Sequence, residues 1–308
     1  MSNRELHEDS FSQEESGSSS GKNVFPRFST DYQVLNLVHD SGMGRIFKAL
    51  HVPSGQIVIL KTLLRQKKES LDSTLKRFER EAKALARFDH PNIVAILDYR
   101  LDGEHPFIAM EYIQGITLRD YMDRFPGGMP LNRFYLIMSQ LCDAVNLIHD
   151  HGIIHRDLKP KNMMVRRGPD GRPQLKVLDF GLILFDRLAF PDGGQGLTLK
   201  SEIIGAPAYM SPEQCKGESV KHLTDIYNIG LIAYELLSGK HPFNGRNLNE
   251  IILQQVQTRP LPLNVVRPEV PSHISAAIGR ALEKDPEKRY FSTKALWLAL
   301  NGTKSGSP

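Results

Sequence analysis

The sequence has few cysteines and no long apolar run, and each shortage excludes a class of protein. Cys142 and Cys215 are its only cysteines and form no Cys-x-x-Cys pair, which suggests reduced thiols in a cytoplasmic protein. No stretch approaches the roughly 20 apolar residues of a membrane-spanning helix. The start of the chain is acidic and lacks the apolar core of a signal peptide. The net charge of +4 is too small to indicate nucleic-acid binding.

The chain divides by composition into a polar leader and a folded region. Residues 1–28 are rich in Ser, Gly and Glu and have little to bury, so we expect a disordered leader. From residue 32 onward, short runs of Val, Ile, Leu and Phe predict strands at 32–38, 46–51, 56–63, 96–101 and 107–112. One helix is predicted among them, because apolar residues recur at helical spacing from Leu71 to Leu85.

The second half of the chain is predicted to be mostly helical. An apolar stripe runs from Phe134 to Ile148 and stops at Gly152, which suits the residue after a helix end. The segment 226–237 is apolar on nearly every face and predicts a buried helix. Further helices are expected around 247–257, 272–282 and 292–300, and a short hairpin is expected to include Leu175 to Leu178.

Two motifs carry the residue types that phosphoryl transfer needs. The first is His155-Arg156-Asp157-Leu158-Lys159-Pro160-Lys161-Asn162, and the second is Asp179-Phe180-Gly181. Asp157 can accept a hydroxyl proton, and Lys159 can meet the transferring phosphate. Asn162 and Asp179 offer the hard oxygen ligands that Mg²⁺ prefers.

These motifs resemble the eukaryotic-type (Hanks-type) serine/threonine protein kinases, most closely their bacterial members. The resemblance implies an α+β, two-lobed fold and ATP and Mg²⁺ as cofactors. It places the kinase domain at 32–300, with an N-lobe at about 32–113, a C-lobe at about 114–300 and a flexible tail at 301–308.

The resemblance assigns further roles on both sides of the cleft. Lys61 would hold the ATP phosphates and Glu81 would pair with it. Arg156 resembles the arginine that gathers a phosphorylated activation segment, with Thr198 and Ser201 as candidate acceptors. The resemblance also implies a nucleotide site formed by Val38, His39, Ser41, Gly42, Gly44, Ile46, Ile59, Lys61, Met110, Glu111 and Met164.

Three departures from the family pattern concern that nucleotide site and its surroundings. His39 and Ser41 stand where glycines would allow close backbone approach to phosphates. Ile59 replaces a small alanine over the adenine, and Ala206 replaces a threonine near the catalytic base. These changes predict a slower or weaker user of ATP.

The run from Gly205 to Glu213 resembles the segment that docks the protein substrate. The resemblance implies that Glu213 pairs with Arg289 and that Asp225 anchors the backbone of the catalytic loop. It also aligns Leu85, Ile96, His155 and Phe180 with the apolar column that ties the lobes together.

The sequence therefore predicts a serine/threonine protein kinase. Its partners would be proteins with Ser/Thr acceptors, including itself through self-association and trans-autophosphorylation. A pseudokinase scaffold is the main alternative, motivated by the altered loop, Ile59 and Ala206. A small-molecule phosphotransferase is disfavoured, because such enzymes usually lack a protein-docking segment.

Overall fold

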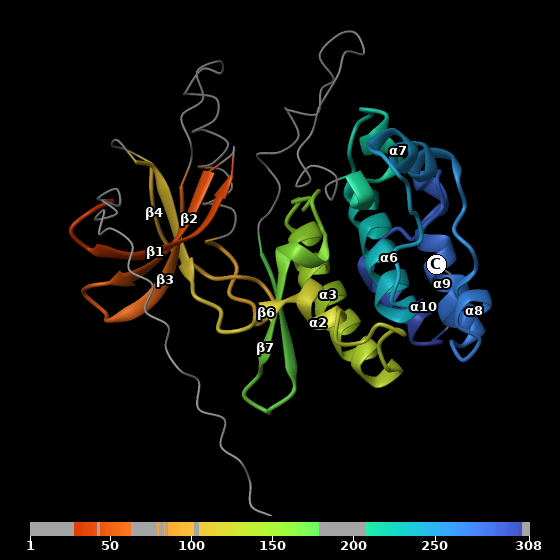
Figure 1. Cartoon of the computed structure of the whole chain (residues 1–308), viewed down its shortest axis with the longest axis horizontal. Coiled ribbons are helices and arrows are strands. Elements are labelled where there is room, and N and C mark those ends of the chain that lie inside the picture. Colours follow the sequence, from red (N-terminus) through yellow and green to blue (C-terminus); the bar gives the residue numbers. More distant parts are fainter. Residues whose placement is uncertain are drawn as a thin grey trace, which may run out of the picture.

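A computed structural model describes residues 28–41, 44–62, 79, 83, 86–101, 105–178 and 207–303. A lobe built on a sheet is followed by a mostly helical lobe, and the β6–β7 region lies between them in Figure 1. This is the α+β, two-lobed architecture that the motifs predict.

The N-lobe is an antiparallel five-stranded sheet of order β1-β2-β3-β5-β4. Its strands are β1 Tyr32–Ser41, β2 Gly44–His51, β3 Gln56–Thr62, β4 Ile96–Arg100 and β5 Phe107–Glu111. Strand side chains alternate between faces, so β3 buries Val58 and Leu60 in an aromatic core. The same alternation turns Ile59 and Lys61 to the opposite face.

The C-lobe begins with a small sheet of order β6-β7-β8 and continues as helices. The sheet contains β6 Ile116–Thr117, β7 Met163–Arg167 and β8 Pro173–Val177. Its α-helices are α2 Leu118–Met122, α3 Leu131–Asp150, α5 Pro212–Cys215, α6 His222–Ser238, α7 Leu248–Gln257, α8 Leu263–Val266, α9 Ser272–Ala281 and α10 Thr293–Leu300. Short 3₁₀ turns occupy Pro160–Asn162, Pro207–Tyr209 and Pro286–Lys288.

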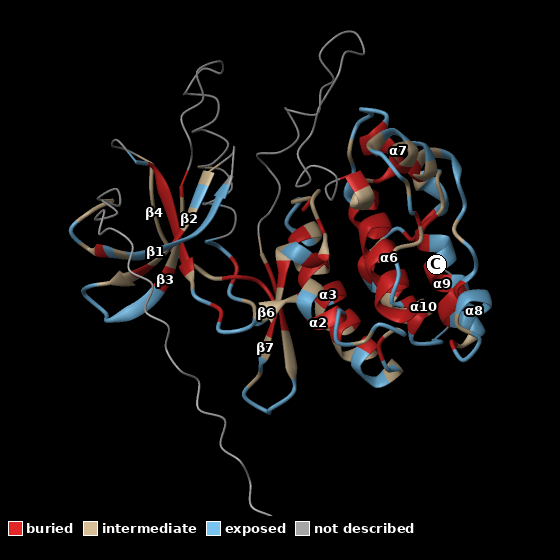
Figure 2. Cartoon of the chain, in the orientation of Figure 1, coloured by how far each residue is buried: buried red, intermediate tan, exposed pale blue. Residues whose placement is uncertain are grey.

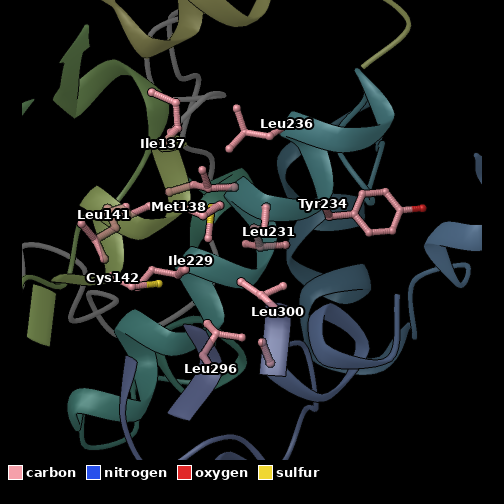
Figure 3. Packing of buried hydrophobic residues seen from close by; sticks show 14 of the residues in the cluster. Ile137, Met138, Leu141, Cys142, Ile229, Leu231, Tyr234, Leu236, Leu296 and Leu300 are labelled. Atoms are coloured by element: carbon pink, nitrogen blue, oxygen red, sulfur yellow. The ribbon is translucent and has the colours of Figure 1, made fainter. Parts of the chain in front are cut away.

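Helix α6 is the centre of the C-lobe core. Figure 2 shows it as almost continuously buried; α3 and α9 pack against it, and α10 packs against α3 and α9. Figure 3 shows Met138 and Leu141 of α3 facing Ile229 and Leu231 of α6, with Leu300 of α10 nearby. The core therefore holds both the helix before the catalytic loop and the helix behind it.

The end of α3 sets the direction in which the chain enters the catalytic loop. Gly152 has φ +72°, its amide donates to the His149 carbonyl (2.9 Å), and the Ile153 amide donates to the Ile148 carbonyl (3.0 Å). These two bonds form a Schellman motif, in which glycine adopts the left-handed conformation without a Cβ penalty. The prediction that Gly152 follows the helix end is confirmed.

Most predicted strands and helices agree with the structure within a few residues. Helix α6 begins at His222, before the predicted start at residue 226, because its polar first turn is also buried. The predicted helix from Leu71 to Leu85 lies largely outside the described residues, although Glu79 and Lys83 are helical. Residues 1–27 and 304–308 lie outside the description as well. Across the described part of the chain, no helix combines the length and apolarity needed to cross a membrane.

Candidate active site

Two residues of the predicted catalytic loop, Lys159 and Asn162, converge on the carboxylate of a third, Asp157. The Lys159 ammonium donates to both oxygens of Asp157, at 3.0 and 2.8 Å. The Asn162 amide nitrogen donates to Asp157 Oδ2 at 2.7 Å and to the Asp157 carbonyl at 2.9 Å. The Asp157 side chain remains 18 % exposed, so it can still reach a substrate. A positioned carboxylate with a neighbouring ammonium suits proton acceptance beside a charged phosphate.

Asp225, at the start of α6, holds the backbone of this loop. Its Oδ2 accepts from the His155 amide and its Oδ1 from the Arg156 amide, each at 2.8 Å. His149 Nε2 lies 2.7 Å from the same carboxylate. Buried backbone donors need such partners, so Asp225 fixes the entry to the loop. Its predicted anchoring role is confirmed.

Arg156 follows this anchor in a rare backbone conformation, with φ +70°. For a residue with a Cβ, the left-handed region costs about 1 kcal/mol or more and persists only where neighbours impose it. The Arg156 carbonyl accepts from Gln214 Nε2 at 2.8 Å, and its amide is held by Asp225. The two bonds hold the turn that leads into Asp157.

His155 connects the loop to the segment that precedes the second motif. Its fully buried ring has Nε2 at 2.9 Å from the Leu178 carbonyl, while Nδ1 lies 3.4 Å from the Asp157 amide. The ring thus lies between the Leu178 carbonyl and the Asp157 amide. His155 therefore tethers the residue directly before Asp179.

An apolar cluster joins the two lobes above the loop. Ile59 and Met110 stand opposite each other on β3 and β5, and they pack with Met164 of β7 and with Leu178. Ile59 and Met164 are only partly buried. This cluster contains Ile59, Met110 and Met164, three of the residues for which the family resemblance predicts a place beside adenine.

The phosphate side of the predicted nucleotide site follows the same sheet face. His39 pairs with Ile46, and Ile46 pairs with Lys61, so these residues share one row across β1, β2 and β3. Val38 is 54 % exposed and His39 is exposed beside it. Gly44 pairs with Ser41 at the end of the hairpin. Lys61 thus lies on the face that also carries Ile59.

Several predicted residues fall outside the described part of the chain and are not placed by it. They are the pairing partner Glu81, the metal ligand Asp179, the loop residue Gly42, Leu85 and Phe180 of the apolar column, Ala206, and the candidate phosphorylation sites Thr198 and Ser201. The Ser41 side chain is likewise outside the description.

The predicted Glu213–Arg289 pair is confirmed. Arg289 donates from its two terminal nitrogens to the two Glu213 oxygens at 2.8 and 2.9 Å, and the Thr224 hydroxyl adds a bond of 2.6 Å. Burial alone would raise the pKa of Glu213, but the bonds and charge of Arg289 outweigh it and lower that pKa. The pair fixes α5, and with it the segment beside Arg156.

One ion pair at the hinge was not predicted from the sequence. The Lys176 ammonium, on β8, donates to Glu111 Oε1 at 2.5 Å and to the Ile93 carbonyl at 3.0 Å. The Ala95 amide also donates to Glu111 Oε1, at 2.9 Å. Lys176 is buried, although a lysine in a short hairpin suggests a solvent-facing position. No spacing in the sequence links the two residues.

The fold and site define a protein kinase domain, and comparison with known proteins agrees. A family model described as the protein kinase domain matches residues 32–297. The chain belongs to this family, and the relatives named here are bacterial Hanks-type serine/threonine kinases.

Three curated relatives illustrate the similarity. Serine/threonine-protein kinase pkn2 of Myxococcus xanthus is 35% identical over 271 residues, covering 87% of this chain and 32% of the relative. Serine/threonine-protein kinase pkn3 of the same organism is 38% identical over 271 residues, covering 86% of this chain and 48% of the relative. PknB of Mycobacterium tuberculosis is 36% identical over 236 residues, covering 75% of this chain and 36% of PknB. The chain thus spans about a third to a half of the length of these relatives.

Solved structures give the same family. The PknI kinase domain of Mycobacterium tuberculosis superposes with a TM-score of 0.66 at 26% sequence identity, covering 89% of this chain and 96% of that domain. A second crystal structure of the same kinase domain superposes with a TM-score of 0.64 at 26% identity, with coverages of 89% and 95%.

Proposed function

We propose that this chain transfers the γ-phosphate of ATP to Ser and Thr hydroxyls of proteins, including its own, with a catalytic unit spanning residues 32–300. The observation that carries the proposal is the Asp157 carboxylate, which is held by Lys159 and Asn162 at 2.7–3.0 Å. The names of the relatives support Ser/Thr rather than Tyr as the acceptor.

The geometry around Asp157 supports a separate role for each of Asp157, Lys159 and Asn162. Its carboxylate accepts the proton of the substrate hydroxyl, whose oxygen forms a bond to the γ-phosphorus while the bond to the β–γ bridging oxygen breaks and ADP leaves. Lys159, already within 3.0 Å of Asp157, neutralises charge on the transferring phosphate. Asn162 keeps the carboxylate in place through its amide nitrogen.

The donor set around the loop fits Mg²⁺. The amide nitrogen of Asn162 is engaged with Asp157, so its carbonyl oxygen is the atom left to face a cation, and hard oxygen is the donor that Mg²⁺ prefers. We propose Asn162 and Asp179 as the protein ligands. Bound Mg²⁺ would neutralise phosphate charge.

The remaining predicted residues complete the proposal. Lys61 would hold the α- and β-phosphates, fixed by Glu81. The nucleotide loop and the residues Ile46, Ile59, Met110, Glu111 and Met164 would enclose the nucleoside.

Regulation and location are proposed on separate grounds. Arg156 would bind a phosphate on the segment that carries Thr198 and Ser201, and this charge pairing can order such a segment. Self-association would allow phosphorylation in trans.

The proposed location is the cytoplasm. Both cysteines are free and buried, which fits a reducing compartment.

The Asp157→Asn variant tests the catalytic role. With labelled ATP and Mg²⁺, the wild-type chain should label itself or a generic basic substrate. Asp157→Asn should lower the rate by about 10²–10⁴, because the general base is lost. The matched control is Asp123→Asn, whose side chain is 65% exposed on the C-lobe and which should label normally. Equal labelling by Asp157→Asn would refute the assignment.

A pseudokinase scaffold is the second candidate, because the branched Ile59 belongs to the apolar cluster where adenine is expected. The two candidates differ in nucleotide binding. A kinase must be stabilised by Mg·ATP through mass action, by about 2.7 kcal/mol at 100 times the Kd. Failure of Mg·ATP to raise the Tm of the full chain would favour the scaffold.

A further inference from the structure

A cavity lies at the far end of the β7–β8 hairpin from the catalytic loop. It has a volume of about 960 Å³ and is walled by the hinge, α2, α3, the hairpin and α10. In Figure 1 this hairpin extends downward between the sheet of the N-lobe and the helices of the C-lobe. The mechanism uses no residue of its wall, so the cavity requires a separate account.

Arginine dominates the charge of this cavity. Arg124, Arg133, Arg166, Arg167 and Arg172 line it, and no Asp or Glu occurs among its described lining residues. We call it the arginine groove. Two carboxylates just outside it partly compensate, since Glu111 lies 4.0 Å from Arg166 and Asp170 lies 3.8 Å from Arg172. The groove keeps an excess of positive charge, because arginine stays protonated at any physiological pH.

The groove also has an aromatic wall. Tyr135 of α3 and Trp297 of α10 meet edge to face, with ring centroids 6.2 Å apart, and Tyr121 stands nearby on α2. Guanidinium groups bind carboxylates through paired hydrogen bonds, and aromatic rings accept apolar side chains. The combination selects an acidic peptide with a few apolar residues.

The chain itself contains such a peptide. Residues 5–15, Glu-Leu-His-Glu-Asp-Ser-Phe-Ser-Gln-Glu-Glu, include five carboxylates, Leu6 and Phe11, and no Lys or Arg. The charge is complementary to that of the arginine groove, and the two apolar side chains suit its aromatic wall.

Chain length allows this segment to reach the groove of its own molecule. The Phe28 ring packs 5.7 Å from the Phe107 ring, and seven residues, or at most about 25 Å of chain, separate Phe107 from Gln114 at the groove. When the lengths of the Phe28 and Phe107 side chains are added, the distance from Phe28 to Gln114 is at most about 40 Å. Thirteen residue steps join Glu15 to Phe28 and can span about 45 Å.

We propose that the arginine groove binds the acidic segment 5–15 of the same chain. The proposal is independent of phosphoryl transfer, because neither the groove nor the segment contains a residue of the catalytic machinery. The groove is then an internal docking surface. Another acidic protein segment could bind there only by displacing the segment 5–15.

Energy transfer within the full chain tests this proposal. Trp297 is the only tryptophan and serves as the donor, and a dansyl thiol reagent on Ser12→Cys serves as the acceptor. The label goes to the new cysteine, because Cys142 and Cys215 are buried and burial raises the pKa of each thiol to about 12. We expect strong transfer at low salt and loss of most of it near 1 M salt, where the Debye length is about 3 Å.

Matched variants decide the outcome. The exposed pair Arg167→Gln/Arg172→Gln should abolish most of the transfer, whereas Arg259→Gln, 79% exposed elsewhere on the C-lobe, should leave it unchanged. Replacing the five leader carboxylates by amides should also abolish it, and this variant leaves the folded lobes untouched. Transfer that survives either change would overturn the proposal. Transfer that increases with protein concentration would also overturn it, because the occupant would then come from a second copy.

Discussion

At the scale of single residues, Ile59 is the residue that we expect to limit nucleotide binding. It faces Met110 across the sheet and packs with Met164 where adenine is expected. Shortening it should widen the slot without touching Asp157, Lys159 or Asn162.

We therefore predict that Ile59→Ala lowers the KM for ATP by about tenfold, the scale at which one or two methylenes matter in an apolar pocket. Steady-state kinetics with varied ATP measure the effect. Val52→Ala, 53 % exposed in the β2–β3 turn, is the control and should leave KM unchanged. A higher KM in Ile59→Ala would show that the branch assists binding.

Lys284 is a second residue whose environment has a measurable consequence. Its ammonium donates to the Tyr227 hydroxyl at 2.9 Å and lies 4.2 Å from the centre of the Phe243 ring. Burial, helped by the charge of Arg289, lowers the pKa of Lys284 from 10.5 to about 7. Folding therefore disfavours the charged form of this lysine.

The sign of the pH dependence follows from that lowered pKa. Between pH 7 and 10.5 the unfolded chain binds more protons at Lys284 than the folded chain, so this group adds stability as pH rises. That stability is full above pH 10.5 and is lost as pH falls toward about 7.

We predict that Lys284→Met is more stable than wild type near pH 7 and that this advantage shrinks toward pH 9. Thermal unfolding at several pH values between these limits measures it. Lys288→Met, 66% exposed, should show no such trend. An advantage that stays constant with pH would contradict the assigned shift.

At the scale of elements, the Glu213–Arg289 pair fixes α5 against the C-terminal part of the lobe. Both side chains are at most 5% exposed. Removing one charge leaves the other buried without its partner, and such single removals typically cost 3–5 kcal/mol.

We predict that Glu213→Gln lowers the free energy of unfolding by about 3 kcal/mol or more, read from urea titration. Glu287→Gln is the matched control, because its partner Lys221 and Glu287 itself are 61% and 70% exposed, and surface pairs contribute about 0–1 kcal/mol. Equal losses in the two variants would mean that burial does not decide the strength of the pair.

The secondary-structure elements were largely predictable, because burial imposes a pattern on the sequence. The apolar residues of β3 predicted that strand, the apolar stripe from Phe134 to Ile148 predicted α3, and Gly152 predicted the end of α3. The first turn of α6 was not predictable in this way. Its polar residues, such as Asp225, are buried because they bond to a loop far away in the sequence, and apolar periodicity carries no sign of that.

At the scale of the whole molecule, two of the contacts that join the lobes differ in how far the sequence predicts them. One is the apolar cluster around Ile59 and Met164, and the other is the Glu111–Lys176 ion pair. The cluster follows from residues that a family resemblance identifies. The ion pair joins positions 65 residues apart, and two charges at such a separation give no sequence signal.

The candidate site likewise contains residues that the sequence predicts and residues that it does not. Asp157, Lys159 and Asn162 lie within one short loop, so their convergence was predictable from spacing and chemistry. The residues that hold that loop come from elsewhere. Asp225 was inferred only through the family resemblance, and Gln214 was not inferred at all.

Phosphosite mapping by mass spectrometry, after incubation of the full chain with ATP and Mg²⁺, tests the central claim most directly. The account predicts phosphate on Ser and Thr residues of the wild-type chain and almost none on Asp157→Asn under the same conditions. Phosphate confined to tyrosine, or equal phosphorylation of both proteins, would contradict it.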